Sequence, residues 1–429
     1  MAPSPICANS CMSADRGGFR PETLAVAHGY DPAQGMGAAK PPVYMTSTFV
    51  YGSAQQAKDI HEAYFDGTGP EVGVVHHIYS RLGHPNLDML EARLAAVDGA
   101  EAAAVFCSGM ATHSTIALAH VRPGDTVLHS RPIYGGTDGL YTMFLPQFGA
   151  TAFDILDGCD GAHIRKRAEA ALALGPLALI VIETPANPTA AMTDIALVVT
   201  IADEIGARTG RRPVVVVDNT LLGPFAQRPI ALGVDLCMTS LTKYCGGHSD
   251  LLAGGVSGRI DLVQPLRLLR TTLGNHLDPY TSWLVLRSME SVHVRSERAM
   301  TNARVVAEYL RDHPKVAGIT YLGFLGEGSA AKAVYDRQCA AAGSTFSFHL
   351  KGGEAEAFRM LDRLRLMKLA VSLGGSETLV CHSASTTHYA VSPENRAAGG
   401  ITDGTIRMSV GIEHVDDLVA DLDQALGAV

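Results

Sequence analysis

Residues that can do chemistry follow directly after two apolar runs of this sequence. Lys243 comes just after the run from Leu236 to Thr239, and Asp218 closes the run from Val214 to Val217. A partly buried lysine has a lowered ammonium pKa and can form a Schiff base with an aldehyde. A carboxylate at a strand end can hold a protonated ring nitrogen. Together they predict a site for pyridoxal 5'-phosphate (PLP), although a surface lysine and a helix N-cap remain the alternatives for each residue alone.

A phosphate cradle is also available. Ser108, Gly109 and Met110 precede an apolar helical stretch, and the backbone N–H groups at a helix N-terminus bind anions. Ser240 and Thr242 add hydroxyls beside the lysine. A Ser-Gly pair alone is an ordinary turn, so this prediction depends on the neighbouring groups.

Two further residues suit the ring and the substrate. Tyr134 stands before Gly135 and Gly136, which allow a close approach, and it could stack on the cofactor ring. Arg407 lies within an apolar strand-like run, where an unpaired guanidinium is costly, and it could bind a substrate carboxylate. The alternatives are a packing tyrosine and a buried ion pair.

A parallel sheet would bring these residues together. Helical or loop stretches separate short apolar runs, and this alternation is typical of an α/β sheet covered on both faces, with ligands beyond the carboxyl ends of the strands. A helix is predicted from Leu87 to Val97, with Gly99 as its stop and with Glu91 and Arg93 facing outward. The predicted strands are residues 102–106, 126–129, 177–182, 214–217 and 236–239.

The second half of the sequence is more helical. We predict one long helix from Ser282 to Leu310 and short strands near residues 344–350 and 406–410, which fits a smaller C-terminal α+β unit.

Composition narrows the classes of function. The formal net charge is −9 without a basic run, so nucleic acid is not an expected partner. We find neither a secretory signal nor an apolar run that could span a membrane, and we expect a cytoplasmic protein. The eight cysteines lack the paired spacing of a zinc site, and the pair Cys7 and Cys11 has no second pair nearby, so we predict no metal.

The combined motifs resemble the Cys/Met-metabolism family of PLP enzymes, from about Pro21 to Val429. This family includes cystathionine γ-synthase, cystathionine γ-lyase, methionine γ-lyase and the O-acylhomoserine sulfhydrylases. The motifs are Ile78-Tyr79-Ser80-Arg81, Ser108-Gly109-Met110, Tyr134-Gly135-Gly136-Thr137, Glu183-Thr184-Pro185-Ala186-Asn187-Pro188, Asp218-Asn219-Thr220, Ser240 to Tyr244, Ser372-Leu373-Gly374-Gly375 and Arg407 to Glu413.

The resemblance implies the type I PLP-dependent transferase (aspartate aminotransferase-like) fold and a homotetramer built as a dimer of dimers. Tyr79 and Arg81 would then reach the cofactor phosphate of a neighbouring subunit, and arginine suits a phosphate. Asn187 would contact the cofactor and the substrate carboxylate, and Ser372 would contact that carboxylate. The implied division is an N-terminal arm of residues 1–80 contacting a neighbouring subunit, a PLP-binding domain of residues 81–280, and a C-terminal domain of residues 281–429.

Several residues depart from the pattern of the relatives. Ile78, Gly139 and Val371 replace charges that would hold the distal end of cystathionine, so cystathionine is a poor substrate candidate. Gly136 replaces the cysteine of methionine γ-lyase, and Arg270-Thr271 replaces its Lys-Asp pair.

Three polar residues stand where the family often has small or apolar ones: His84, His113 and Asp138. A lone histidine is usually structural, and the sequence leaves open whether any of the three contacts substrate. Asp138 beside Gly139 points to a polar or cationic leaving group, as in canavanine.

The leading interpretation is a PLP-dependent γ-lyase of sulfur amino-acid metabolism, acting on a methionine- or homoserine-type amino acid. Lys243 would move the α-proton, and Tyr134 would act as general acid to the leaving group. The alternatives are γ-replacement, as in cystathionine γ-synthase or an O-acylhomoserine sulfhydrylase of transsulfuration, and a non-catalytic PLP-binding regulatory protein. The complete set of costly polar groups argues against the last.

Overall fold

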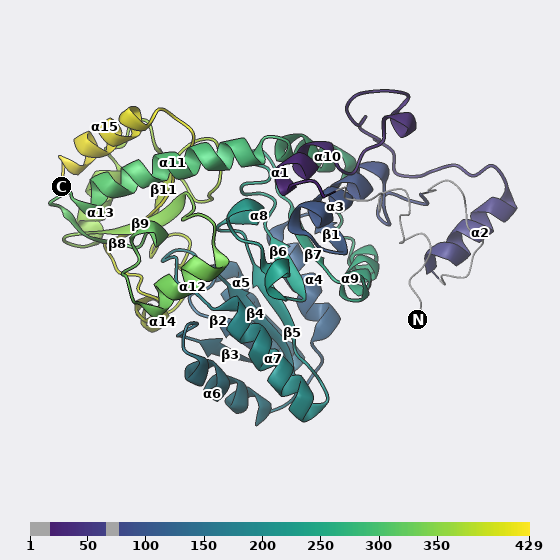
Figure 1. Cartoon of the computed structure of the whole chain (residues 1–429), viewed down its shortest axis with the longest axis horizontal. Helices are drawn as coiled ribbons and strands as arrows, with labels where there is room; N and C mark the ends of the chain where they lie inside the picture. The colour runs from purple at the N-terminus through teal and green to yellow at the C-terminus, as the bar shows by residue number, and fades with distance from the viewer. Residues whose placement is uncertain (1–17, 66–76) are drawn as a thin grey trace.

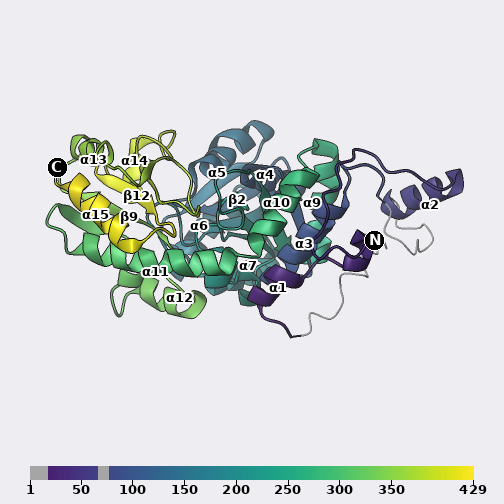
Figure 2. The same cartoon turned by 90° about the horizontal axis from the view of Figure 1, so that it is seen from above.

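The computed structural model describes residues 18–65 and 77–429. Cys7 and Cys11, the pair considered above for a metal, lie outside the described residues. Within the described ranges, no group of His, Cys, Asp and Glu side chains is arranged to hold a metal ion, and no helix is long and apolar enough to cross a membrane. Two sheets dominate the chain, with the smaller one beside the C-terminus, and α11 (Val292–Arg311) extends from beside α10 (Pro279–Met289) along the smaller sheet (Figures 1 and 2).

The larger sheet has seven strands in the order β1-β7-β6-β5-β4-β2-β3. Strands β6, β5, β4, β2 and β3 pair in parallel, and β7 pairs antiparallel with both β1 and β6. This arrangement confirms the predicted mostly parallel sheet. The strands are β1 (Ala102–Phe106), β2 (Thr126–Ser130), β3 (Thr151–Ile155), β4 (Leu177–Glu183), β5 (Val214–Asp218), β6 (Leu236–Thr239) and β7 (Gly254–Gly258).

Burial on both faces explains why the central strands are apolar without alternation. Along β4, Leu179 and Val181 join a core with α4 (Gly109–His120) and α9 (Ile260–Leu273). Ile180 and Ile182 point to the opposite face and pack with α6 (Gly161–Leu172) and α7 (Ile195–Thr209). The prediction missed β3, which has a more exposed and less regular pattern, and β7, which is rich in glycine.

The helix predicted near Asn86 is α3 (Pro85–Asp98), which ends at Gly99 in the left-handed region. The outward orientation predicted for Glu91 and Arg93 is wrong, because both side chains are buried. Arg93 donates to the carbonyls of His28 and Leu286, and Glu91 pairs with Arg270 at 2.5 Å. The helix contacts other elements on nearly all sides. The spacing of its polar residues therefore does not correspond to a solvent-exposed face.

The predicted long helix is two helices, α10 (Pro279–Met289) and α11 (Val292–Arg311). Ser291 lies between them in a non-helical conformation. Its hydroxyl donates to the carbonyl of Ser288 and accepts from Arg295 Nε, so the side chain competes with the helical hydrogen-bond pattern.

The N-terminal segment also contains helices that the sequence did not predict. α1 (Pro21–Ala27) packs on α3 of its own chain through Leu24 and Ala25. α2 (Ala54–Phe65) lies farther out, at the side of the molecule away from the C-terminus (Figure 1).

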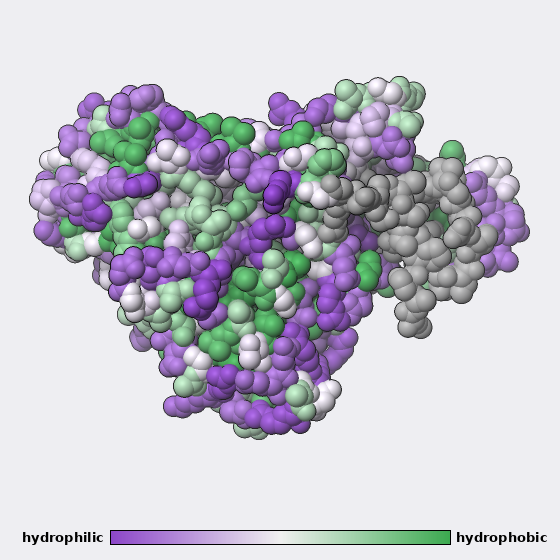
Figure 3. Space-filling model, in the orientation of Figure 1, coloured by the Kyte–Doolittle hydropathy of each residue, from purple (hydrophilic) through white to green (hydrophobic). Residues whose placement is uncertain are grey.

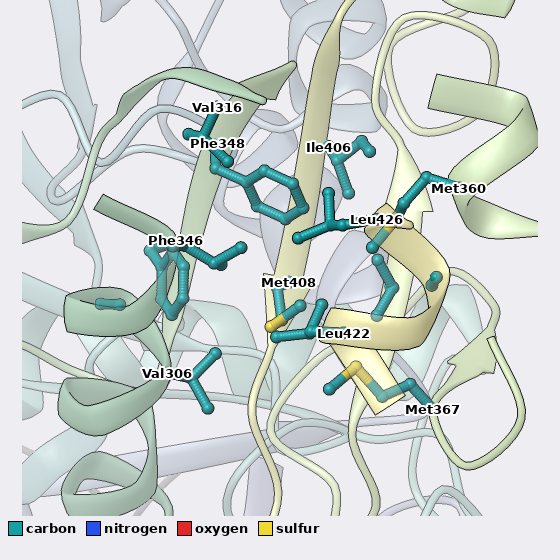
Figure 4. Close-up of a cluster of buried hydrophobic side chains, with 14 of the residues drawn as sticks. Val306, Val316, Phe346, Phe348, Met360, Met367, Ile406, Met408, Leu422 and Leu426 are labelled. Atoms are coloured by element: carbon teal, nitrogen blue, oxygen red, sulfur yellow. The ribbon is translucent and has the colours of Figure 1, made fainter. Parts of the chain in front are cut away.

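The smaller sheet has the strand order β10-β11-β12-β9-β8. α11 and α15 contribute Val306, Leu422 and Leu426 to its core, against Phe346, Phe348 and Met408 of the sheet (Figure 4). The strands are β8 (Val316–Ile319), β9 (Thr345–Leu350), β10 (Lys368–Leu369), β11 (Leu379–His382) and β12 (Thr405–Ser409). The remaining helices are α5 (Gly135–Gly139), α8 (Gly223–Ala226), α12 (Ala330–Gln338), α13 (Glu354–Leu361), α14 (Pro393–Ala398) and α15 (Val415–Leu426).

The outer side of the larger sheet is charged. Exposed ion pairs join α6 to α7, Arg165 with Glu204 at 2.7 Å and Arg208 with Glu169 at 2.6 Å. The lower rim of the face in Figure 3, where these two helices lie, is correspondingly hydrophilic. The site residues lie elsewhere, where the strand ends of the larger sheet meet the smaller sheet.

Candidate active site

Lys243 lies between the two sheets. It follows β6 in a turn, and its Nζ donates to Ser372 Oγ at 2.9 Å. Burial, together with the nearby Arg407 charge, lowers the pKa of Lys243 to about 8. The amine therefore has a substantial neutral fraction near neutral pH, as a nucleophile or proton acceptor requires.

Ser372 belongs to a loop that packs directly on the lysine segment. Its φ is +94°, a left-handed value that is costly for a residue with a side chain. At Gly374, an added Cβ would lie 2.8 Å from the backbone nitrogen of Tyr244, so only glycine permits this approach. The loop thus holds Ser372 against Lys243.

Arg407 on β12 continues the same chain of contacts. Its Nη2 donates to the carbonyl of Ser372 at 2.5 Å, and its Nη1 donates to Asn187 Oδ1 at 3.1 Å. The side chain is buried, and within the described part of the chain its Nε has no hydrogen-bond partner. A buried guanidinium with a donor to spare suits a carboxylate ligand.

Asp218 ends β5 beside the lysine segment. Its Oδ1 accepts from the amide of Thr220 at 3.0 Å, and its Oδ2 lies 3.0 Å from His113 Nε2. His113, which the sequence left without a role, is therefore attached to the predicted ring-nitrogen partner.

Glu183 organises two predicted site residues and was missed as a site residue. One carboxyl oxygen accepts from the amide of Tyr134 at 2.6 Å, and the other accepts from the amide of Asn187 at 2.7 Å. Burial, with the Asp218 charge beside it, raises the pKa of Glu183 to about 8. Its signal in the sequence was the same as that of Asp218, an acid closing an apolar run.

The Tyr134 ring is 44% exposed and packs over Gly136. A Cβ added at Gly136 would lie 2.8 Å from Tyr134 Cε1 and 3.1 Å from Met110 Sδ. The absence of a side chain at position 136 therefore allows this position of the tyrosine ring.

The N-terminus of α4 and the end of β6 form the predicted phosphate cradle. Ser108 accepts from the amide of Ala111 as the N-cap, and the first-turn amides of Gly109 and Met110 remain as donors. Ser240 is adjacent, since a Cβ on Gly109 would come within 3.1 Å of its hydroxyl. Thr242 is closer to β7, because its hydroxyl both donates to and accepts from the backbone of Ala253.

Tyr79 and Arg81 have other contacts. Tyr79 bridges to Thr48 of the N-terminal segment. Arg81 lies over the Tyr79 ring and donates to the carbonyl of Thr271 near the end of α9. Their predicted contact with a neighbouring subunit concerns a chain that this structure does not contain.

The remaining polar candidates have structural partners. His84 caps α3, where it accepts from the amide of Leu87 and contacts the carbonyl of Leu277, and burial lowers its pKa to about 4. Asp138 Oδ1 lies 2.9 Å from Arg131, which is shared with Asp154, and within the described residues this buried oxygen has no hydrogen-bond partner. The sequence also missed His388, a buried loop residue whose pKa burial and the Arg407 charge lower to about 4.

These groups fit PLP by their chemistry. An amine of lowered pKa, a carboxylate, an exposed aromatic face and a helix N-terminus correspond to the aldehyde, the ring nitrogen, the ring and the phosphate. The spare donor of Arg407 corresponds to a substrate carboxylate.

Comparisons with known proteins identify relatives along almost the whole chain. The family model for the Cys/Met metabolism PLP-dependent enzymes matches residues 22–427. L-methionine γ-lyase of Pseudomonas putida is 40% identical over 95% of this chain and 97% of the relative, and that of Pseudomonas deceptionensis is 38% identical over 95% and 97%. The crystal structure of cystathionine γ-synthase from Xanthomonas oryzae pv. oryzae, in complex with aminoacrylate and cysteine, has a TM-score of 0.84 at 33% identity, covering 96% of this chain and 98% of that chain.

Proposed function

The chain belongs to the Cys/Met metabolism PLP-dependent enzyme family, and from this premise we propose that it is a γ-lyase acting on a methionine- or homoserine-type amino acid. The observation that carries the proposal is the continuous set of contacts from Lys243 through Ser372 to Arg407. Lys243 contacts the hydroxyl of this serine and Arg407 its carbonyl, which supports a proton acceptor and a carboxylate-binding group close together. When bound, PLP supplies an electron sink for the carbon atoms of the substrate.

The substrate would be oriented by its α-carboxylate. In our proposal Arg407, Asn187 and Ser372 bind this group, and the Nε of Arg407 is the donor with capacity to spare. Lys243 then lies near the α-carbon and moves the α-proton, a role that its pKa of about 8 favours.

Tyr134 is the proposed general acid to the γ-leaving group. Its side chain is partly exposed at the mouth of the site, while its backbone amide is held by Glu183. Because its backbone is held, the Tyr134 hydroxyl stays within a limited region of the site. A general acid must be positioned in this way to protonate the leaving group.

The surroundings favour an uncharged γ-substituent. Val371 is an exposed apolar side chain, and a Cβ at Gly139 would meet nothing within 4 Å, so neither position supplies a charge to a substituent. Arg131 lies 2.9 Å from Asp138 and therefore competes for this carboxylate with a cationic leaving group such as that of canavanine. Methionine and O-acetylhomoserine are therefore the first substrates to test.

The test is an assay of the purified holoenzyme with methionine, O-acetylhomoserine, canavanine and cystathionine. We expect 2-oxobutyrate, ammonia and the released thiol or acetate from the first two. The proposal would be overturned if neither methionine, O-acetylhomoserine nor canavanine is turned over while cystathionine is synthesised efficiently. A spectral change on adding amino acids without any product would instead support a non-catalytic binding protein.

A γ-replacement reaction is the second candidate, favoured by the likeness to a cystathionine γ-synthase structure. Addition of cysteine, sulfide and methanethiol separately to reactions with O-acetylhomoserine distinguishes the two. Adducts in place of 2-oxobutyrate would identify replacement as the main reaction.

The assembly and location follow from the same proposal. We place the enzyme in the cytoplasm as a homotetramer in which Tyr79 and Arg81 serve a neighbouring subunit's phosphate. The support is that Arg81 is exposed and donates to the carbonyl of Thr271 near the end of α9, where another subunit could reach it. Sedimentation would measure the assembly, and Arg81→Ala should weaken PLP retention.

A further inference from the structure

We propose that His113 is a positioning residue that holds Asp218 toward the cofactor's ring nitrogen. This inference rests on the proposed function, because it takes Asp218 as the partner of that nitrogen. His113 comes from the buried side of α4, and its Nε2 lies 3.0 Å from Asp218 Oδ2. Its side chain is 1% exposed, so substrate cannot reach it and it acts only through Asp218.

The hydrogen bond fixes the form of the histidine. A carboxylate oxygen can only accept, so Nε2 must carry the proton and donate it. Nδ1 is buried and has no hydrogen-bond partner among the described residues. A neutral ring protonated on Nε2 leaves this nitrogen without a proton and avoids burying an unpaired N–H. His113 is thus committed to one contact, the one with Asp218.

The two oxygens of Asp218 are held from different elements. The amide of Thr220 holds Oδ1 from the segment after β5, and His113 holds Oδ2 from α4 across the sheet face. Two fixed donors leave the carboxylate little freedom to rotate. Without His113, Oδ2 would lose its only side-chain donor within the described contacts, and Asp218 would hold a ring cation less well.

Other titratable groups also feel Asp218. Its charge raises the pKa of Tyr141, Glu183 and Cys237, each of which burial raises first, and it opposes the lowering of the pKa of Lys243. A pH titration of the cofactor absorbance therefore reports on several groups. The effect of His113 is the difference between the titration midpoints of the variant and of the wild type.

His113→Leu removes the donor and keeps a side chain of similar bulk, and His113→Gln restores an N–H donor. His120→Leu is the matched control, because His120 lies on the same helix about two turns away and its Nε2 is also buried without a partner in the described residues. Two properties of each variant are measured: the dissociation constant of PLP from the apoenzyme, and the pH dependence of the visible absorbance of the holoenzyme.

We expect His113→Leu to raise the PLP dissociation constant roughly tenfold, as loss of a charge-assisted hydrogen bond predicts, and to shift the midpoint of the absorbance titration. His113→Gln should recover most of both, and His120→Leu should match the wild type. Agreement of His113→Leu with the wild type within about twofold, or an equal change in His120→Leu, would overturn the inference. If His113→Leu does not fold, His113→Met replaces it under the same criteria.

Asp218→Asn separates this inference from the proposed function. A large change in Asp218→Asn with none in His113→Leu rejects only the role of His113. No change in Asp218→Asn rejects the assignment of Asp218 and with it the site on which the proposed function depends.

Discussion

Glu183 and Asp218 are direct register partners at the carboxyl ends of β4 and β5. Parallel pairing brings two buried carboxyl groups side by side, and one of them responds by keeping its proton, since the pKa of Glu183 is raised to about 8 by burial and by Asp218. The two carboxyl groups have different partners in the site. In our proposal Asp218 faces a ring nitrogen, while Glu183 accepts from the amides of Tyr134 and Asn187.

Glu183 should make the stability of the apoenzyme depend on pH. A group whose pKa is higher in the folded than in the unfolded chain stabilises the fold at low pH, and this contribution is lost as pH rises through the folded pKa. The wild-type melting temperature should therefore fall between about pH 4.5, the unfolded value, and about pH 8, and Glu183→Gln should flatten this fall. Glu204→Gln, at an exposed glutamate, should leave it unchanged. An equally steep fall in Glu183→Gln would contradict the assignment.

Gly136→Ala should impair catalysis by displacing Tyr134. The added Cβ would lie 2.8 Å from the tyrosine ring, a distance that forces the ring to move. We expect kcat for γ-elimination to drop about tenfold or more, as misplacement of a reacting group does. The control is Gly326→Ala, in the loop before α12, whose Cβ meets nothing within 4 Å. Equal kcat values for the two variants would mean that the ring position does not matter.

Lys243→Met should stabilise the apoenzyme near neutral pH. The pKa of Lys243 is lowered from 10.5 to about 8, so charging it costs more in the folded than in the unfolded chain. The wild type recovers this loss as pH rises from about 8 to about 10.5, and the two melting temperatures should converge over that range. A lower melting temperature of the variant at neutral pH would show that the Ser372 contact outweighs the burial of the amine.

Breaking the ion pair between Glu91 and Arg270 should lower the stability of the fold strongly. Both side chains are buried, and Glu91→Gln would leave Arg270 without its counter-charge. Loss of one partner of a buried pair costs about 3 to 5 kcal/mol. Urea unfolding should reveal this loss, whereas Glu204→Gln, at an exposed pair that water screens, should have a much smaller effect. A small effect at both sites would contradict the importance assigned to burial.

The sequence predicted the strand ends well because a parallel sheet leaves a strong pattern. Fully buried strands are apolar on both faces, so the polar residues at or just after the end of each run, Asp218 and Lys243 for example, are conspicuous. Strand β7 was missed because its glycines carry no such pattern. They are required by close packing, since a Cβ at Gly254 would lie 2.3 Å from the Ser108 carbonyl oxygen.

Some features of the fold and the site depend on tertiary contacts that the sequence pattern does not reveal. Glu91 and Arg93 have the spacing of an exposed helix face, and only α1, α10 and the adjacent sheet bury them. The role of Glu183 depends on two amides brought to it by loops, and the contact of His113 depends on how α4 lies across the sheet. Neither contact has a signature in sequence spacing, because the partners are far apart along the chain.

The most direct test of the central claim is to locate the cofactor on the chain. The holoenzyme is treated with borohydride, which reduces the bond between a lysine amine and PLP to a stable one. The protein is then digested, and mass spectrometry identifies the peptide that carries PLP. We predict that the PLP adduct lies on Lys243 and that Lys243→Ala carries no adduct and releases no 2-oxobutyrate from methionine. An adduct on another lysine, or full activity of Lys243→Ala, would contradict the account.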